Sequence, residues 1–417
     1  MKYYHIIAFG CQMNKSDAER LAAILEGLGY QKTDNEKSAD LIAVVACSVR
    51  QSAVDRIYGK IKIWNKLKKN KKIVTLLTGC VLKSDQKKLS QSFDLIFDIK
   101  NLNKLPKLLK KERPISSDYF SVTPKYQSKF QAYVPISTGC NNYCTYCVVP
   151  YARGPEISRP AKEIINEVKS LINSGYKETT LLGQNVNSYY SENYNFPKLL
   201  KTINDLPGNF WLNFVTSHPK DLSDELIKIM ANGKKICQYM HLPVQAGDNK
   251  VLKAMNRHYT SVHYKNLIKK IRKAMPDIAI STDIIVGFPK ETKAQFNNTA
   301  KLMKQINFDM AYLAEYSPRP GTAAAKLEDN VPAAEKSRRW KILNEILKKS
   351  ALKNNKNYLK KIVEVLINNH DKGYFYGKTK TFKTVKIKKS PNIKIGDIIK
   401  VKIIKAADFC LEGVRLE

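Results

Sequence analysis

The chain has 417 residues, enough for two to four domains, and its 72 basic and 37 acidic side chains give a formal net charge of +35. It contains no signal-like segment and no apolar run of about 18 residues, so we expect no membrane span and a cytoplasmic location. The charge favours a polyanionic partner such as nucleic acid, although the lysine bias of an AT-rich genome would also produce it. Eight cysteines without an extracellular signal indicate thiols that bind metals.

The first part of the chain, residues 1–115, alternates short apolar runs with helical stretches. A helix over Lys15–Leu28 is predicted to open with a capping box of Ser16 and Glu19, and a second helical stretch begins near Ala53. Four apolar runs are predicted strands: Tyr4–Phe9, Leu41–Ala46, Ile73–Leu77 and Leu95–Ile99. This order predicts an α/β domain with a small parallel sheet and helices on its faces.

One cysteine follows each of the first three predicted strands, and we call Cys11, Cys47 and Cys80 the N-terminal cysteine set. Because the carboxyl ends of parallel strands share one edge of the sheet, where α/β folds bind ligands, we expect these thiols to converge. Three thiolates without a fourth ligand suit an iron–sulfur cluster. The alternative is that each is an ordinary buried cysteine, the commonest environment of this residue type.

A polar, proline-bearing stretch at 111–118 is a predicted linker, and a longer β/α alternation occupies residues 126–355. Helices are predicted at Ala161–Ser174 and Leu222–Ala231, and a long helix at Ala333–Lys353 ends this part. Six strands are predicted: Tyr133–Ser137, Thr179–Gly183, Trp211–Thr216, Ile236–Leu242, Ile278–Val286 and Met310–Tyr316. Six such units fit a partial TIM-like barrel, whose chemistry lies at the C-terminal ends of its strands.

The loop after the first barrel strand contains Cys140, Cys144 and Cys147 in the spacing Cys-x3-Cys-x2-Cys, which we call the loop cysteine set. Soft thiolates on a short loop suit a four-iron cluster and leave one iron open to a cofactor or substrate. Zinc is the alternative, but the next histidine is His218. This spacing resembles the radical S-adenosylmethionine (SAM) superfamily, in which the open iron binds SAM and an electron cleaves it to a 5′-deoxyadenosyl radical.

Polar residues and glycines after the other barrel strands are candidate contacts to SAM. They are Gln184, Asn185, Gln245, Asp283 and Gly287. Each of them has a purely structural role as its alternative. Arg153 and Arg319 are weaker candidates for contacts to substrate or phosphate.

The C-terminal part, residues 356–417, changes to short β-type runs. Five strands are predicted: Val363–Ile367, Gly373–Gly377, Thr384–Lys388, Ile398–Ile404 and Cys410–Val414. This pattern fits a small β-barrel of the OB type. Between Tyr374 and Lys383 aromatic residues alternate with lysines, as in surfaces that stack single-stranded RNA, although a half-buried strand gives a similar alternation.

Motifs along the whole chain resemble the methylthiotransferases, which are radical SAM enzymes with an N-terminal three-cysteine domain and a C-terminal TRAM domain. Among them the MiaB-type tRNA enzymes are the most similar. The matching runs include Gly10-Cys11-Gln12-Met13-Asn14, Gly79-Cys80, Cys147-Val148-Val149-Pro150-Tyr151-Ala152-Arg153-Gly154, Leu182-Gly183-Gln184-Asn185, Thr216-Ser217-His218-Pro219 and Tyr316-Ser317-Pro318-Arg319-Pro320-Gly321-Thr322. One departure is Val45-Ala46 before Cys47, where the family commonly has Asn-Thr.

The resemblance implies two 4Fe–4S clusters. The loop cysteine set would hold the one that cleaves SAM, and the N-terminal set an auxiliary one that carries the sulfur. One SAM would methylate that sulfur, and a second would yield the radical that removes hydrogen from C2 of N6-isopentenyladenosine next to the anticodon. A radical route suits this carbon because an unactivated aromatic C–H offers no acidic proton.

The resemblance also implies partners. They are the anticodon stem-loop of tRNA, an electron donor such as flavodoxin or ferredoxin, and a sulfur source; the protein is expected to act as a monomer away from membranes. Three other functions stay open at this point: methylthiolation of threonylcarbamoyladenosine in tRNA, methylthiolation of a ribosomal protein, and a non-catalytic iron–sulfur protein that binds RNA.

Overall fold

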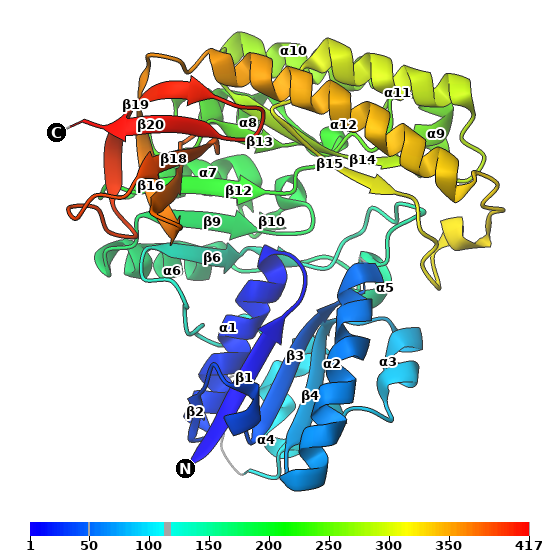
Figure 1. The fold of residues 1–417 in the computed structure, drawn as a ribbon, viewed down its shortest axis with the longest axis vertical. Coiled ribbons are helices and arrows are strands. Elements are labelled where there is room, and N and C mark those ends of the chain that lie inside the picture. The colour runs from blue at the N-terminus through cyan, green and yellow to red at the C-terminus, as the bar shows by residue number, and fades with distance from the viewer. Residues whose placement is uncertain (49–50, 112–117, 417) are drawn as a thin grey trace.

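The computed structural model describes residues 1–48, 51–111 and 118–416, which form three successive parts (Figure 1). An α/β unit is followed by a larger layer of strands and helices and then by a closed β-barrel. The predicted linker at 111–118 lies almost wholly outside the described residues. Within those residues, no helix combines the length and the apolarity needed to cross a membrane.

The N-terminal part is a five-stranded parallel sheet in the order β2-β1-β3-β4-β5, as predicted apart from the short edge strand β2. Every residue of the central strand β3 is buried, because α1 packs on one face and α2 on the other. The elements are β1 Lys2–Ala8, α1 Gln12–Gly27, β2 Tyr30–Lys32, β3 Leu41–Cys47, α2 Gln51–Asn70, β4 Val74–Cys80, α3 Lys83–Leu89, β5 Leu95–Ile96 and α4 Leu105–Leu108.

The predicted capping box of Ser16 and Glu19 is wrong. Helix α1 begins earlier, with Cys11 as its N-cap residue and the Asn14 side chain accepting from the Cys11 backbone N–H at 3.4 Å. Ser16 and Glu19 are buried within the helix. There the Ser16 hydroxyl donates to the Tyr133 carbonyl at 3.5 Å, so these polar residues join the helix to the next part of the chain instead of opening it.

Glu19 makes folding stability depend on pH. Its carboxylate accepts a backbone N–H from Gln127 at 3.1 Å, and burial raises its pKa from 4.5 to about 7. A raised folded-state pKa gives stability that is present below pH 4.5 and is lost as the pH rises through about 7, amounting to at most about 3 kcal/mol. We expect the urea midpoint to fall less between pH 5 and pH 8 in Glu19→Gln than in the wild type. Equal falls would contradict this.

The middle part consists of two three-stranded parallel sheets, β12-β9-β6 and β13-β14-β15, which an isolated bridge between Leu212 and Ile236 helps to join. Helices cover the outside, so the predicted partial barrel is confirmed (Figure 1). Strand β13 is shorter than predicted, because Ile236 contributes only that bridge. The main elements are β6 Gln131–Pro135, α6 Ala161–Asn173, β9 Glu178–Leu182, α7 Phe196–Asn204, β12 Trp211–Val215, α8 Asp224–Asn232, β13 Tyr239–His241, α10 Ser261–Ala274, β14 Ala279–Val286, α11 Lys293–Ile306, β15 Met310–Glu315 and α12 Ala333–Lys356.

Shorter elements lie in the connections of this middle part. Most of them follow the carboxyl end of a barrel strand, where they shape the loops at that end of the barrel. They are β7 Ser137–Thr138, α5 Val149–Arg153, β8 Ile157–Ser158, β10 Tyr190–Ser191, β11 Tyr194–Asn195 and α9 Asn249–Ala254.

The C-terminal part is the predicted five-stranded barrel, closed in the order β16-β17-β18-β20-β19. It packs on the N-terminal ends of the middle strands, where Trp211 and Cys237 are buried with Leu366. The small barrel therefore lies at the opposite end of those strands from the loops that follow them. Its strands are β16 Ile362–Asp371, β17 Tyr374–Lys378, β18 Thr384–Lys388, β19 Ile398–Ala406 and β20 Leu411–Arg415.

The predicted row of aromatics and lysines in this barrel is only partly exposed. Phe375 lies in the barrel core, and the Phe382 ring stacks on Tyr239 of the middle part at a centroid distance of 4.5 Å. Tyr374 is only partly buried, and Lys386 lies 3.7 Å over its ring. The interpretation of the whole row as an RNA-stacking surface is therefore wrong for Phe375 and Phe382, and it stays a prediction for Tyr374 and for Tyr376, which is also only partly buried.

Candidate active site between the two cysteine sets

The structure brings the three residues of the N-terminal cysteine set together. Cys47 and Cys80 end β3 and β4 and are direct neighbours in the sheet. The loop after β1 approaches so closely that a Cβ built on Gly10 would lie 2.8 Å from the Cys47 Cβ. Burial raises the pKa of the Cys80 thiol to about 12, and charges on Cys47 and Cys11 add to this rise, as expected for thiols that share one site.

The loop cysteine set is also gathered, on a loop held by many backbone hydrogen bonds. The Cys147 N–H donates to the Cys144 carbonyl at 2.9 Å, and the Cys140 N–H donates to the Gly154 carbonyl at 3.2 Å. Burial raises the pKa of the Cys147 thiol to about 12, and charges on Cys144 and Cys140 raise it further. Such thiols stay protonated unless a metal takes the place of the proton.

Gly139 allows the loop that carries the loop cysteine set to pack tightly against the backbone at Pro155. Its φ is +79°, and a Cβ there would lie 2.0 Å from the Pro155 carbonyl oxygen. We expect Gly139→Ala to remove the iron of the loop cysteine set, measured as iron per chain. Gly175, at φ +84° with open space around its Cα, is the matched control, because alanine there adds only backbone strain of about 1–2 kcal/mol. Equal iron loss in both variants would contradict this explanation.

The donors around the sulfurs fit iron–sulfur clusters. Backbone and guanidinium N–H groups donate to sulfurs of both sets: Val149 to Cys147 at 3.4 Å and Arg153 to Cys80 at 2.7 Å. Such hydrogen bonds stabilise bound thiolates. In the part of the chain that the structure describes, no three Cys, His, Asp or Glu side chains are placed to hold a single metal ion.

A cavity of about 690 Å³ adjoins the loop cysteine set. Cys147, Gln245 and Asp283 line it, together with Arg319, and its size suits a nucleoside-sized ligand. Val148 also lines the cavity, and it packs with Cys80 of the N-terminal cysteine set in one apolar cluster. The cavity thus reaches toward both sets, which makes it the candidate active site.

Several candidate SAM contacts carry buried oxygens that have no hydrogen-bond partner within the described residues. Because native proteins rarely leave such atoms unpaired, a polar ligand at the strand ends would explain them. The atoms are Gln184 Oε1, Asn185 Oδ1 and Gln245 Oε1, and Ser137 Oγ and Ser217 Oγ nearby are unpartnered as well. Asn185 also donates to Asp221 at 2.7 Å, and it lines a second, smaller cavity of about 290 Å³.

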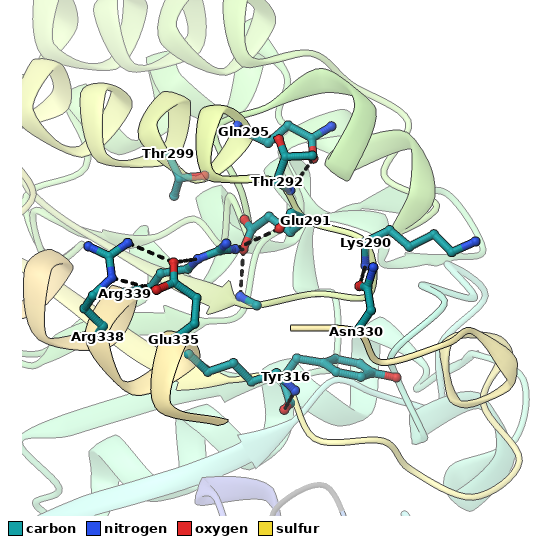
Figure 2. Close-up of polar contacts among 12 residues, drawn as sticks. Lys290, Glu291, Thr292, Gln295, Thr299, Tyr316, Asn330, Glu335, Arg338 and Arg339 are labelled. Atoms are coloured by element: carbon teal, nitrogen blue, oxygen red, sulfur yellow. Dashed lines mark hydrogen bonds and ion pairs between the residues drawn. The ribbon is translucent and has the colours of Figure 1, made fainter. Parts of the chain in front are cut away.

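Asp283 and Gly287 have protein partners. Asp283 Oδ2 lies 3.3 Å from His241 Nε2. The Gly287 N–H donates to the Glu291 carboxylate at 2.7 Å, which also accepts from Arg339 of α12 at 2.8 Å (Figure 2). Asp283 lines the main cavity. Gly287 instead belongs to a set of hydrogen bonds that fasten the loop after β14 to the long helix α12.

Two residues near the cysteines escaped the sequence analysis. Arg257 donates to Cys144 Sγ at 3.5 Å, and Asn256 donates to the Tyr143 carbonyl within the cysteine loop at 3.0 Å. Their polar run after α9 was the only signal in the sequence. Arg153, proposed as a substrate contact, is instead 1% exposed and forms an ion pair with Asp17, so that interpretation is wrong.

Comparisons with known proteins agree with this arrangement. Three protein families match parts of the chain: the "Radical SAM superfamily" at residues 134–303, the "Uncharacterized protein family UPF0004" at 3–98 and the "TRAM domain" at 356–416. Among solved structures, the radical S-adenosylmethionine methyltransferase TsrM from Kitasatospora setae has a TM-score of 0.59 at 14% identity, covering 78% of this chain and 75% of its own. At that identity the likeness concerns the fold alone.

Relatives along the full length are more similar. The chain is 41% identical to the tRNA-2-methylthio-N(6)-dimethylallyladenosine synthase of Clostridium botulinum strain Hall, over 99% of this chain and 97% of the relative. It is 42% identical to the synthase of the same name from Carboxydothermus hydrogenoformans, over 99% of each. The chain therefore belongs to the family of tRNA-2-methylthio-N(6)-dimethylallyladenosine synthases, within the radical SAM superfamily.

Proposed function

We propose that this protein methylthiolates C2 of N6-isopentenyladenosine next to the anticodon of tRNA, with SAM as methyl donor and radical source. The observation that carries the proposal is the cavity of about 690 Å³ that is lined by Cys147 and by Val148, which packs with Cys80. Relatives at about 41% identity are named for this reaction, which supports the choice of substrate.

In this proposal each cysteine set holds a 4Fe–4S cluster. When bound, the clusters supply the electron that cleaves SAM and the sulfur that is transferred. Cys140, Cys144 and Cys147 ligate the first cluster, and Arg257 keeps Cys144 in place. The N-terminal set ligates the auxiliary cluster. Two such sets around one cavity are what a transfer between two bound groups requires.

Residues around the cavity orient the ligand. Gln245 lines the cavity, and its unpartnered oxygen would accept a hydrogen bond from an amino group of SAM. Gln184 and Asn185, just after the end of the strand β9, carry unpartnered oxygens that would do the same. Asp283 is the carboxylate that faces the same cavity, and its neighbour His241 fixes its orientation. Gly287 contributes through the shape of its loop, which Glu291 and Arg339 hold.

The rest of the proposal concerns partners and domains. The N-terminal domain covers 1–115, the radical SAM core 126–355 and the TRAM domain 356–417. The TRAM domain and the strongly basic chain bind the anticodon stem-loop through its phosphates and bases. A flavodoxin- or ferredoxin-like electron donor, a sulfur source, the monomeric state and the cytoplasmic location stay predictions.

The test is nucleoside mass spectrometry of tRNA from a host that lacks its own enzyme, with and without this gene. Conversion of N6-isopentenyladenosine to its 2-methylthio form is expected. Conversion of threonylcarbamoyladenosine instead would keep the reaction and overturn the substrate. No change with either nucleoside, from a protein that holds its iron, would overturn the tRNA assignment and direct attention to ribosomal protein.

A further inference from the structure

The short helix α5 connects the two cysteine sets. It begins two residues after Cys147, and the N–H of its first residue, Val149, donates to the Cys147 sulfur at 3.4 Å. Its last residue, Arg153, donates through Nε to the Cys80 sulfur at 2.7 Å. Ala152 and Val148 pack with Cys80 in one apolar cluster. Figure 1 shows α5 at the carboxyl edge of the N-terminal sheet, between the two parts of the molecule.

Arg153 is fully buried, and Asp17 balances its charge. Its Nη2 forms an ion pair with the Asp17 carboxylate, whose other oxygen accepts the Tyr119 hydroxyl at 2.6 Å. Arg20, on the same helix as Asp17, lies 5.2 Å over the Tyr119 ring. A guanidinium in such a dry place is tolerable only because it is paired and hydrogen-bonded.

The third nitrogen of this guanidinium has no such partner. Arg153 Nη1 is buried and has no hydrogen-bond acceptor among the residues that the structure describes. A buried charged donor without a partner is destabilising, so Nη1 favours a further acceptor. Sulfur atoms of a cluster held by the N-terminal cysteine set are acceptors of the right kind.

We propose that Arg153 is a positioning residue that tunes the auxiliary cluster: it donates to the Cys80 thiolate, offers Nη1 to the cluster sulfurs, and raises the cluster's reduction potential. Asp17 limits this effect by balancing the charge. A cationic hydrogen-bond donor favours the more negative, reduced state of a cluster, and that is the basis of the expected direction. The inference rests on the proposed function, because it needs the auxiliary cluster.

The competing explanation is a simple latch, in which the ion pair only fastens α1 to α5. The two explanations differ in sign. Arg153→Met removes the positive charge and lowers the potential, whereas Asp17→Asn leaves that charge unbalanced and raises it. If the ion pair only fastens α1 to α5, both variants break the same contact, so their reduction potentials should shift in the same direction or not at all. Arg153→Lys keeps the charge without the planar donor set, and restores part of the shift.

The experiment uses the full chain with Cys140, Cys144 and Cys147 replaced by alanine, reconstituted with Fe²⁺ and sulfide. Iron content and an EPR-monitored redox titration then report on the auxiliary cluster alone. Arg159→Met is the matched control, since Arg159 is also buried and pairs with Glu163 and Glu167 instead of a cysteine. It is expected to leave the potential unchanged.

Opposite shifts in Arg153→Met and Asp17→Asn at equal iron content support the proposal. Unchanged potentials, or shifts in one direction, overturn it while the proposed function stands. If Arg153→Met fails to fold, the other two variants decide: a higher potential in Asp17→Asn and a lower potential in Arg153→Lys support the proposal, and shifts in one direction overturn it. A background protein without iron would overturn the auxiliary cluster, and with it both the proposed function and this inference.

Discussion

Replacing Cys144 by alanine is expected to abolish formation of 5′-deoxyadenosine when the reconstituted protein is mixed with SAM and dithionite. Two thiolates cannot hold the cluster of the loop cysteine set, and Arg257 would lose the sulfur to which it donates at 3.5 Å. Chromatography of the nucleoside products measures the effect, which should be a fall to the level of the protein-free mixture.

The chain offers its own control for that experiment. Cys410 lies half-buried in the C-terminal barrel, outside both cysteine sets, and its thiol donates to the Leu411 carbonyl. Cys410→Ala should cleave SAM at the wild-type rate. Product at that rate from Cys144→Ala would refute the role of the loop cysteine set.

The second large effect is expected from alanine at Cys11, Cys47 and Cys80 together. Iron should fall from about eight to about four per chain, because each set binds its own cluster. This variant should still cleave SAM, since the loop cysteine set is intact, but it should produce no methylthio nucleoside. Iron analysis, SAM cleavage and nucleoside mass spectrometry on one preparation separate these outcomes.

A triple variant that keeps all its iron would show that the N-terminal cysteines are ordinary buried residues. A variant that also loses SAM cleavage would instead indicate that the two parts fold as one unit. The contact between Arg153 and Cys80 makes the second outcome worth checking by the thermal midpoint of the variant.

The positions of the cysteines could be predicted from the sequence because they depend on short-range patterns. Continuous apolar runs such as Leu41–Cys47 predict buried parallel strands, and a residue at the end of such a strand lies at the ligand-binding edge. The spacing of the loop cysteine set is local as well. Elements that follow from such patterns agree with the structure to within a few residues.

Long-range polar contacts could not be predicted in this way. Arg153 and Cys80 are 73 residues apart, and Arg257 and Cys144 are 113 apart, and no periodicity connects either pair. The alternation around Phe382 likewise does not distinguish a face open to solvent from one that packs on Tyr239. Ser16 and Glu19 fit an N-cap pattern, yet tertiary contacts decided their place.

The place of the C-terminal barrel has a consequence for the length of RNA that the enzyme can use. It packs on the N-terminal ends of the middle strands, around Trp211, while the cavity beside Cys147 lies at their carboxyl ends. A substrate that touches both ends gains avidity from two weak contacts, because binding at one raises the effective concentration at the other. An RNA loop too short to reach from the C-terminal barrel to the cavity would engage only one of these two contact sites. As the RNA is shortened, its affinity should therefore drop in one step, at the length where the second contact is lost.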